Sequence, residues 1–183
     1  MLIANQKRKE NIAEYLLYMW QVEDTIRANA LDIDRVQKNI IDQFQLPDET
    51  KAEMREWYEN LIEMMRIENL QQGGHLQINK NVIIELSDLH QRLLASDREP
   101  FYTAAFYKTL PYIVELRSKA GENKVGELET CFMALYGVLM LRLQQKELSQ
   151  ETMEAVKQIS TFLAILSEKY RLDKAGELKL GDE

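Results

Sequence analysis

Two pairs of carboxylates with metal-binding spacing are the residues whose chemistry is easiest to specify. Glu56 and Glu59 stand three residues apart in one segment of helical pattern, and Glu85 and Asp88 do so in the next. Residues at i and i+3 share a helix face, so two such pairs on adjacent antiparallel helices could bind a hard cation such as Mg²⁺. The pattern therefore allows a metal site made of these four carboxylates.

The positions of these carboxylates on their helices favour a solvated acidic face over a metal site. At about 100° per residue, Glu56 and Glu59 lie nearly opposite an apolar stripe formed by Met54, Trp57, Leu61 and Met65. Asp88 is likewise turned away from the apolar stripe of its own helix. We therefore expect no metal ion and no cofactor. The alternative is a site that resembles the magnesium-binding motifs of all-α nucleotide pyrophosphohydrolases.

The histidines and the cysteine do not supply another catalytic centre. His90 is expected at the edge of an apolar stripe, where a packed histidine bonded to a neighbour is typical. His75 follows Gly73 and Gly74 in a segment expected to be a loop, with its ring exposed. Cys131, the single cysteine, has no histidine near it in the sequence. Because phosphate-binding loops and nucleophile motifs are also absent from the sequence, we name no catalytic residue.

A charged residue interrupts the apolar stripe of the helix expected from Asn11 to Ala28. The stripe consists of Ile12, Leu16, Met19 and Ile26, and Glu23 projects from the same side. A buried carboxylate without a partner costs several kcal/mol, so Glu23 must find cations or hydrogen-bond donors. We expect a partly buried polar cluster in which Glu23 is paired by arginines, with three candidates: Arg27, Arg117 and Arg142. The alternative is that each arginine head reaches water at a helix end.

The composition describes an acidic globular chain. Its 183 residues can form the core of one domain without metals or disulfides. Lysine and arginine number 23 against 30 aspartates and glutamates, and the net charge of -7 disfavours nucleic acid as a partner. The longest uncharged apolar stretch, from Cys131 to Leu141, is shorter than the ~20 residues that cross a bilayer. Carboxylates also interrupt the apolar run near the N-terminus, so we expect a cytoplasmic protein without a signal peptide or a membrane partner.

Apolar residues recur at helical spacing throughout, and no strand is expected. The expected helices cover 11–28, 32–45, 47 to the Gly73-Gly74 pair, 79–93 with Asn79 as cap, a fifth that begins at Pro100 and ends before Gly121, 127–146, and 149–173 with Ser149 as cap. Pro111 is expected to kink or break the fifth of them. The sequence therefore predicts an all-α antiparallel bundle of about seven helices, in one domain over residues 1–173 with a flexible tail over 174–183.

The segment from Glu127 to Lys146 is expected to be the central helix of the bundle. It is apolar nearly all round between Cys131 and Leu141, which is typical of a helix buried on every side. Glycine costs about 1 kcal/mol relative to alanine inside a helix, so Gly137 suggests that another helix approaches closely there. We therefore expect this helix to be the most buried in the domain.

Two helices carry more apolar side chains than one core face needs. Ile67 and Leu70 lie off the stripe of the third helix, and Phe101, Ala105 and Tyr112 lie off that of the fifth. Such helices are either buried on two sides or form an interface. Other apolar side chains could line a cavity for a small ligand, although they fall at core spacing: Met19, Trp20, Trp57, Met64, Met65, Tyr102, Phe106 and Tyr107.

Three stretches of the chain resemble a known family. They are NIAEYLLYMWQVEDTIR from Asn11 to Arg27, GHLQINKNVIIEL from Gly74 to Leu86, and the apolar run from Cys131 to Leu141. Apart from its tail, nearly the whole chain is similar to a bacterial family catalogued as domain of unknown function 4924. The resemblance implies an all-α bacterial protein, and it supplies no activity, cofactor or site residue.

The sequence as a whole favours an interaction protein over an enzyme. We expect a cytoplasmic helical module that forms a homo-oligomer or binds a protein partner and has no catalytic activity. The alternative is a magnesium-dependent nucleotide pyrophosphohydrolase, and the third hypothesis is a bundle that binds a small ligand. The sequence does not identify a partner or a ligand.

Overall fold

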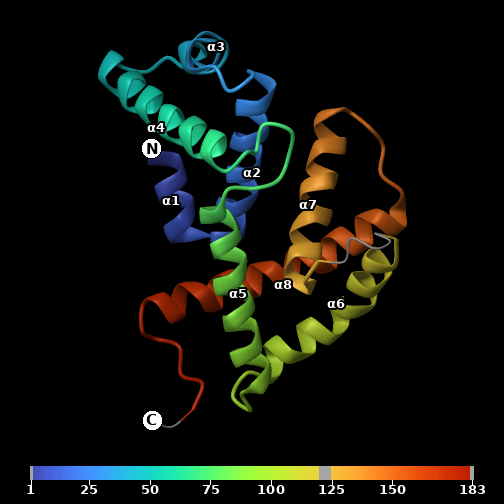
Figure 1. Ribbon diagram of the computed structural model, residues 1–183. Coiled ribbons are helices and arrows are strands. Elements are labelled where there is room, and N and C mark those ends of the chain that lie inside the picture. The colour runs from blue at the N-terminus through green and yellow to red at the C-terminus, as the bar shows by residue number, and fades with distance from the viewer. Residues whose placement is uncertain (1, 120–124, 182–183) are drawn as a thin grey trace.

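The computed structural model describes residues 2–119 and 125–181, and all regular structure in these ranges is helical (Figure 1). The elements are α1 (Leu2–Glu10), α2 (Ile12–Ala28), α3 (Ile33–Asn39), the short 3-10 helix η1 (Ile41–Gln43), α4 (Asp48–Ile67), α5 (Gln77–Ala95), α6 (Pro100–Lys119), α7 (Glu127–Leu143) and α8 (Gln150–Lys174). The predicted all-α bundle is confirmed, and α1 is the helix that the sequence did not lead us to expect. Within the described ranges, no helix combines the length and apolarity needed to cross a membrane.

The helix α2 is the best covered element of the bundle. It packs against α1, α4, α5, α7 and α8. Nine of its 17 residues are buried. Asn11 caps the helix, because its side chain accepts hydrogen bonds from the backbone N–H groups of Ala13 and Glu14. The stripe that includes Glu23 therefore faces protein on most of its length.

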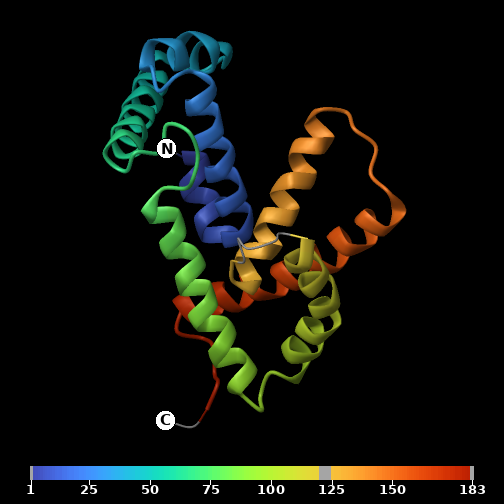
Figure 2. The same cartoon turned by 45° about the vertical axis from the view of Figure 1, so that its right-hand side comes forward.

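The helix α7 lies at the centre of the packing, but the prediction that it is the most buried helix is wrong. It packs against α2, α5, α6 and α8, yet only five of its 17 residues are buried. No residue of α7 beyond Val138 is buried, and Figures 1 and 2 show this end of the helix rising away from α8. The close approach predicted at Gly137 is also wrong, since no described atom of another element lies within 4 Å of a Cβ built there.

Three predicted helix boundaries differ from the structure. The helix expected over 32–45 is divided into α3 and η1, and Phe44 is exposed. The helix α4 ends at Ile67, before the Gly73-Gly74 pair, because Asn69 adopts left-handed backbone with φ 57°. The N–H groups of Asn69 and Leu70 then bond to carbonyls of the last helical turn, which closes the helix with a Schellman motif. Asn79 does not cap α5, because that helix begins at Gln77.

Other boundaries agree with the sequence. Pro100 begins α6, and Ser149 caps α8 by accepting a hydrogen bond from the backbone N–H of Thr152. The helix α6 continues through Pro111, so the predicted break is absent, while Gly121 lies outside the described residues. In the segment after α8, Leu178 and Leu180 pack partly against the core. The carbonyl of Leu180 also accepts a hydrogen bond from Ser96 at 2.8 Å, which ties this segment to the end of α5.

Candidate functional site

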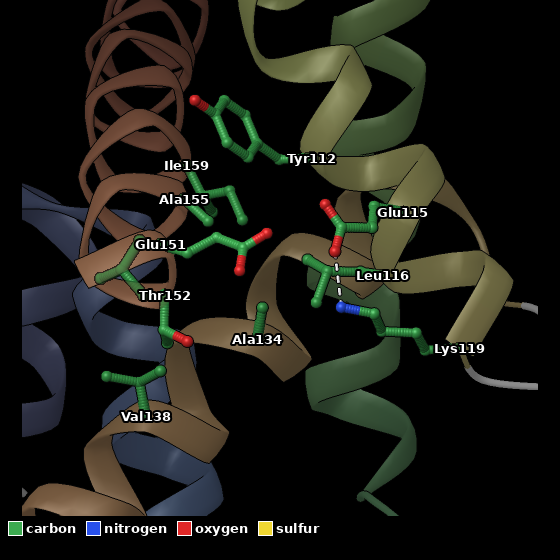
Figure 3. A pocket seen from close by; sticks show the side chains of 11 residues that line it. Tyr112, Glu115, Leu116, Lys119, Ala134, Val138, Glu151, Thr152, Ala155 and Ile159 are labelled. Carbon is green, nitrogen blue, oxygen red and sulfur yellow. Dashed lines mark hydrogen bonds and ion pairs between the residues drawn. The ribbon is translucent and has the colours of Figure 1, made fainter. Parts of the chain in front are cut away.

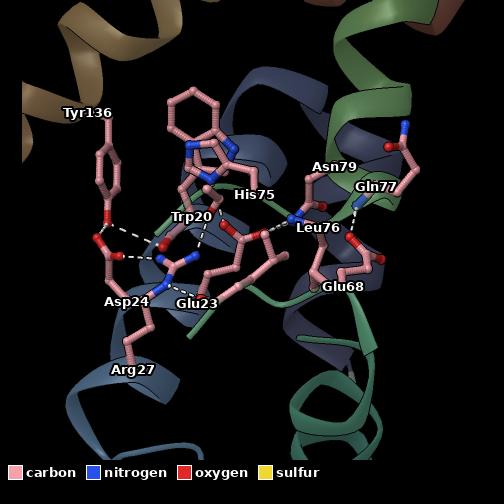
Figure 4. Close-up of polar contacts among 12 residues, drawn as sticks. Trp20, Glu23, Asp24, Arg27, Glu68, His75, Leu76, Gln77, Asn79 and Tyr136 are labelled. Atoms are coloured by element: carbon pink, nitrogen blue, oxygen red, sulfur yellow. Dashed lines mark hydrogen bonds and ion pairs between the residues drawn. The ribbon is translucent and has the colours of Figure 1, made fainter. Parts of the chain in front are cut away.

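Glu23 is fully buried, and its partners come from the segment that leads into α5 and from the first turn of that helix (Figure 4). One carboxylate oxygen, Oε1, accepts hydrogen bonds from the backbone N–H of Leu76 at 2.9 Å and from the side-chain amide of Asn79 at 2.7 Å. The other, Oε2, lies 2.6 Å from Nδ1 of His75. An ionised carboxylate can only accept, so Nδ1 of His75 carries the proton in this contact. We call Glu23 with its partners His75, Leu76 and Asn79 the Glu23 clasp.

The Glu23 clasp caps α5 from a distant part of the chain. No side chain of the residue before α5 caps this helix, so its first N–H groups need other acceptors. Glu23 accepts from the N–H of Leu76, and Glu68 accepts from that of Gln77 at 2.8 Å. Negative charge near a helix N-terminus is also stabilised by the helix dipole. The carboxylate in the apolar stripe of α2 therefore joins that helix to the start of α5.

Arg27, one turn further along α2, holds the segment between α4 and α5. Its Nε donates to the carbonyl of Leu70 at 2.9 Å, and a second guanidinium nitrogen donates to the carbonyl of Gly74. The third nitrogen pairs with Asp24 at 2.6 Å. Gly74 has φ 86°, which side chains rarely adopt, and a Cβ there would lie 3.1 Å from the Leu70 side chain. Arg27 thus stabilises the conformation of the segment between α4 and α5 that places His75 beside Glu23.

Trp20 connects the clasp to α7. Its ring stacks on the imidazole of His75 with centroids 4.0 Å apart, and the ring of Tyr136 packs edge-on against it at 5.5 Å. The hydroxyl of Tyr136 also donates to the carboxylate of Asp24 at 2.5 Å. Burial, and then this hydrogen bond to Asp24, raise the pKa of Tyr136 above its usual value, so the phenol remains protonated. The clasp is therefore continuous with the contact between α2 and α7.

The clasp has the geometry of a structural site. Glu23, Trp20 and Asn79 are buried, and 28% of the His75 side chain is exposed. None of these residues lines the two cavities described below. Two buried atoms, Nε1 of Trp20 and Oδ1 of Asn79, have no hydrogen-bond partner in the described part of the chain. The buried carboxylate therefore holds α2 and the start of α5 together inside the protein.

The arginine partners predicted for Glu23 are wrong. Arg27 lies at the same site but pairs with Asp24. Arg142 is exposed on α7, and Arg117 lies on α6 with its Nε buried and without a hydrogen-bond partner in ranges 2–119 and 125–181. His75 lies in a loop as expected, but its ring is half-buried and not exposed, because it contacts Trp20 and Glu23.

The partners of Glu23 can be recognised in the sequence by their place at the start of a helix, although a search for opposite charges does not find them. His75 and Asn79 flank the start of a helical pattern, where backbone N–H groups have no acceptor within the helix. Such N–H donors can pair with a buried carboxylate on another helix, as the N–H groups of an arginine would. The start of α5 is therefore a place where donors for Glu23 are available.

The four carboxylates of the metal hypothesis do not form a metal site. Glu56 and Glu59 are exposed on α4. Glu85 accepts a hydrogen bond from Tyr170 at 2.9 Å and pairs with Lys174 at 2.8 Å, and this lysine contact lowers the pKa of Glu85. Among the described residues, which include Asp88, no three His, Cys, Asp or Glu side chains are placed to hold a metal ion. The structure therefore supplies no magnesium site for the hydrolase hypothesis.

His90 is a second buried polar residue, and it is packed and bonded as the sequence indicates. Its Nδ1 lies 2.6 Å from the hydroxyl of Tyr102, while Nε2 lies 3.8 Å from Glu127 without a hydrogen-bond partner among the described residues. Aromatic rings surround the imidazole: Tyr102, Phe106 and Phe162. Burial lowers the pKa of His90, and the charge of Glu127 opposes this only in part. Burial also raises the pKa of the Cys131 thiol on α7 to about 12, so that thiol is unreactive at neutral pH.

Two cavities lie along α6 and α8. The first, of about 150 Å³, is enclosed by α6, α7 and α8, with an apolar wall and three charged side chains, Glu115, Lys119 and Glu151 (Figure 3). The second, of about 240 Å³, lies between α6 and α8 beside Phe101 and Phe162. The aromatic and methionine side chains expected to line a ligand cavity line neither of them. The first cavity is also below the roughly 300 Å³ at which ligand pockets begin.

One face at the end of α7 is uncharged and only partly covered. It consists of Met133, Gly137, Met140 and Gln144, which we call the α7 face, and they lie on one side at about 100° per residue. Met140 is half-buried and the other three are exposed, with Gln144 directly after the last residue of the helix. Met133 is 51% exposed, and the neighbouring Leu143 is 66% exposed. A helix that is apolar all round is normally covered all round. Here the described chain covers one side only.

Comparison with known proteins supplies a family for the chain. No curated protein matches it, and no solved structure does. A family model matches residues 1–177, which is nearly all of the 183 residues and includes all eight helices. The family is described as "Domain of unknown function (DUF4924)", and the match confirms the resemblance inferred from the sequence. The chain therefore belongs to the DUF4924 family.

Proposed function

We propose that the protein is a cytoplasmic interaction module without catalytic activity, which binds another protein surface through α7 and the adjoining parts of α6 and α8. The observation that carries the proposal is the α7 face. The helix has no charged residue between Cys131 and Leu141, and Met133 and Gly137 are nevertheless exposed. Exposed apolar surface of this kind is typical of protein interfaces.

Neighbouring helices carry further exposed apolar side chains. On α6, Phe101 is 72% exposed, and Tyr107 and Val114 are also exposed. Met153 is exposed near the start of α8. Methionine and aromatic side chains are enriched in interfaces because they bury a large area and, in the case of methionine, adapt to the partner's shape.

The other two hypotheses have no comparable support. The hydrolase requires carboxylates that share a metal ion, and no three such ligands come together among the described residues. The small-ligand bundle requires an apolar cavity lined by the core aromatics, and those rings pack against one another instead. Glu23 is fully buried and bonded within the chain, and His90 is only 2% exposed, so neither side chain is open to a ligand.

A single charge on the α7 face tests the proposal. Met133→Glu keeps a good helix former at an exposed position, so the monomer should fold normally while association is lost. Light scattering at tens of micromolar should give the wild-type chain a mass above the 21.5 kDa of the monomer, or a retained partner protein, and the variant should lose either one. The matched control is Gln91→Glu on the exposed side of α5. A monomeric wild type that retains no partner, or association unaffected by Met133→Glu, would overturn the proposal.

A further inference from the structure

We propose that the α7 face pairs with the α7 face of a second copy of this chain, with the two helices antiparallel and closest where Gly137 of each copy receives Met140 of the other. The inference rests on the proposed function and names the partner. It follows from the spacing of the four residues, from the open space at Gly137 and from the distribution of charge along α7.

The spacing of the α7 face is the same in both directions along the helix. Steps of four, three and four residues separate Met133, Gly137, Met140 and Gln144. This is the alternation by which one helix packs against another. An antiparallel copy therefore presents the same pattern in register, with Met133 opposite Gln144 and Gly137 opposite Met140. A two-fold contact requires a surface that is complementary to itself, and this stripe satisfies that requirement.

Gly137 supplies a hole that the chain itself does not use. A Cβ at this position would meet no described atom of another element within 4 Å, so the fold of the single chain does not require glycine here. Glycine in the middle of a helix is unfavourable unless something approaches closely. In the antiparallel pair, the flexible Met140 side chain of each copy fills the space at Gly137 of the other copy. In a parallel pair the two glycines would face each other and leave a gap, and the two methionines would crowd.

The charges of the molecule favour this face and this orientation. Each chain carries a net charge of -7, so two copies repel each other except where neither presents charge. The stretch from Cys131 to Leu141 is uncharged. The first turn of α7 is acidic, with Glu127 and Glu129, whereas Arg142 is in its last turn and Lys146 follows. Antiparallel pairing brings the acidic end of one helix near the basic end of the other.

Directed disulfide formation tests the orientation. A tagged Met133→Cys chain is mixed with an untagged Gln144→Cys chain under mild oxidation, and disulfide-linked species are separated by size. The antiparallel pair predicts the mixed tagged–untagged product, because it places these positions opposite each other and separates two copies of position 133 by about 16 Å. The native Cys131 is buried and unreactive, so it does not interfere. A Gln91→Cys chain on α5 is the control for random collision.

A bulky residue at position 137 tests whether the space at Gly137 receives Met140 of the second copy. Gly137→Leu should weaken self-association by about tenfold or more, since it fills the space assigned to Met140 of the second copy. Gln91→Leu, which adds the same side chain to exposed α5, should leave association unchanged. If tagged and untagged Met133→Cys chains link to each other instead, or if Gly137→Leu associates like the wild type, the inference is overturned. The proposed function would still stand in that case if Met133→Glu prevents association, so the two failures are distinguishable.

Discussion

The Glu23 clasp and the α7 face depart from the rule of apolar inside and polar outside in opposite directions. At the clasp, a carboxylate is buried because Leu76, Asn79 and His75 supply donors within the same chain. At the α7 face, Met133 remains half exposed, and no described part of the chain covers it. A polar group in the core had to be satisfied by the fold itself, since its isolation would cost several kcal/mol. Exposing apolar surface to water costs far less, so the monomer can leave such surface uncovered until a second molecule binds there.

This difference separates folding from association. Changes at the clasp should alter the stability of the monomer, because the clasp joins α2, α5 and the segment between α4 and α5. Changes at the α7 face should leave the monomer intact and alter its assembly. The largest expected effect therefore belongs to Glu23, and the smallest effect on monomer stability belongs to Gly137.

Replacing Glu23 with alanine should destabilise the monomer by about 2 to 4 kcal/mol. The change removes the acceptor for the N–H of Leu76 and for the amide of Asn79, and both donors remain buried. Urea unfolding followed by circular dichroism measures the loss. The exposed carboxylate of Glu53 on α4 provides the control, and Glu53→Ala should change stability by about 0.5 kcal/mol or less. Equal effects of the two substitutions would show that the clasp contributes nothing beyond a surface carboxylate.

The sequence predicted the faces of the helices well because periodicity fixes them. Glu23 is buried as its place in the stripe of α2 required, and Val82, Leu86, Leu89 and Leu93 line the core side of α5. The partners of Glu23 could not be predicted in the same way. They are delivered by a segment whose path depends on left-handed backbone at Asn69 and Gly74 and on its bonds to Arg27. Such a path depends on tertiary contacts and has no period in the sequence.

The burial of α7 was overestimated for a different physical reason. Hydrophobic periodicity reports how much of a helix is suited to contact protein, and it does not distinguish contacts within the chain from contacts with another chain. The uncharged run from Cys131 to Leu141 was therefore interpreted as the most buried part of the domain. Phe132 is buried as expected, whereas Met133 and Gly137 are exposed. The same pattern is now an argument for an interface.

His90 belongs to neither region, and its burial predicts a pH dependence of stability. Burial lowers the pKa of His90 below the ordinary value of 6.5. As the pH falls below that value, the unfolded chain gains a proton that the folded chain does not, so the free energy of unfolding decreases. The decrease ends once His90 is protonated in the folded chain as well. The contribution of His90 is therefore present at neutral pH and is lost on acidification.

Comparison of the wild type with His90→Gln isolates this contribution, because both chains retain His75 and all carboxylates. Glutamine can still bond to Tyr102 but does not titrate. The stability advantage of the wild type over the variant should shrink between pH 7 and pH 5 in denaturant unfolding measured at fixed ionic strength. A difference that is constant or grows toward acid pH would mean that His90 accepts a proton in the folded chain as easily as in the unfolded chain. In that case water would reach the His90 side chain, between α5, α6 and α7, more easily than its burial in the structure indicates.

Replacing Gly137 with alanine gives the smallest effect on monomer stability, with a sign opposite to that of Glu23→Ala. At protein concentrations low enough to keep the chain monomeric, Gly137→Ala should stabilise it by about 0.5 to 1 kcal/mol. The position lies inside α7, and the new methyl group would meet no described atom of another element within 4 Å. Thermal unfolding measures the gain, with Gln91→Ala on exposed α5 as the control for helix propensity alone. A loss of stability in dilute Gly137→Ala would mean that the glycine serves the fold of the single chain. A gain in stability would mean that Gly137 destabilises the monomer. Helix propensity would then favour alanine, so the fold of the monomer would give no reason for glycine at this exposed position.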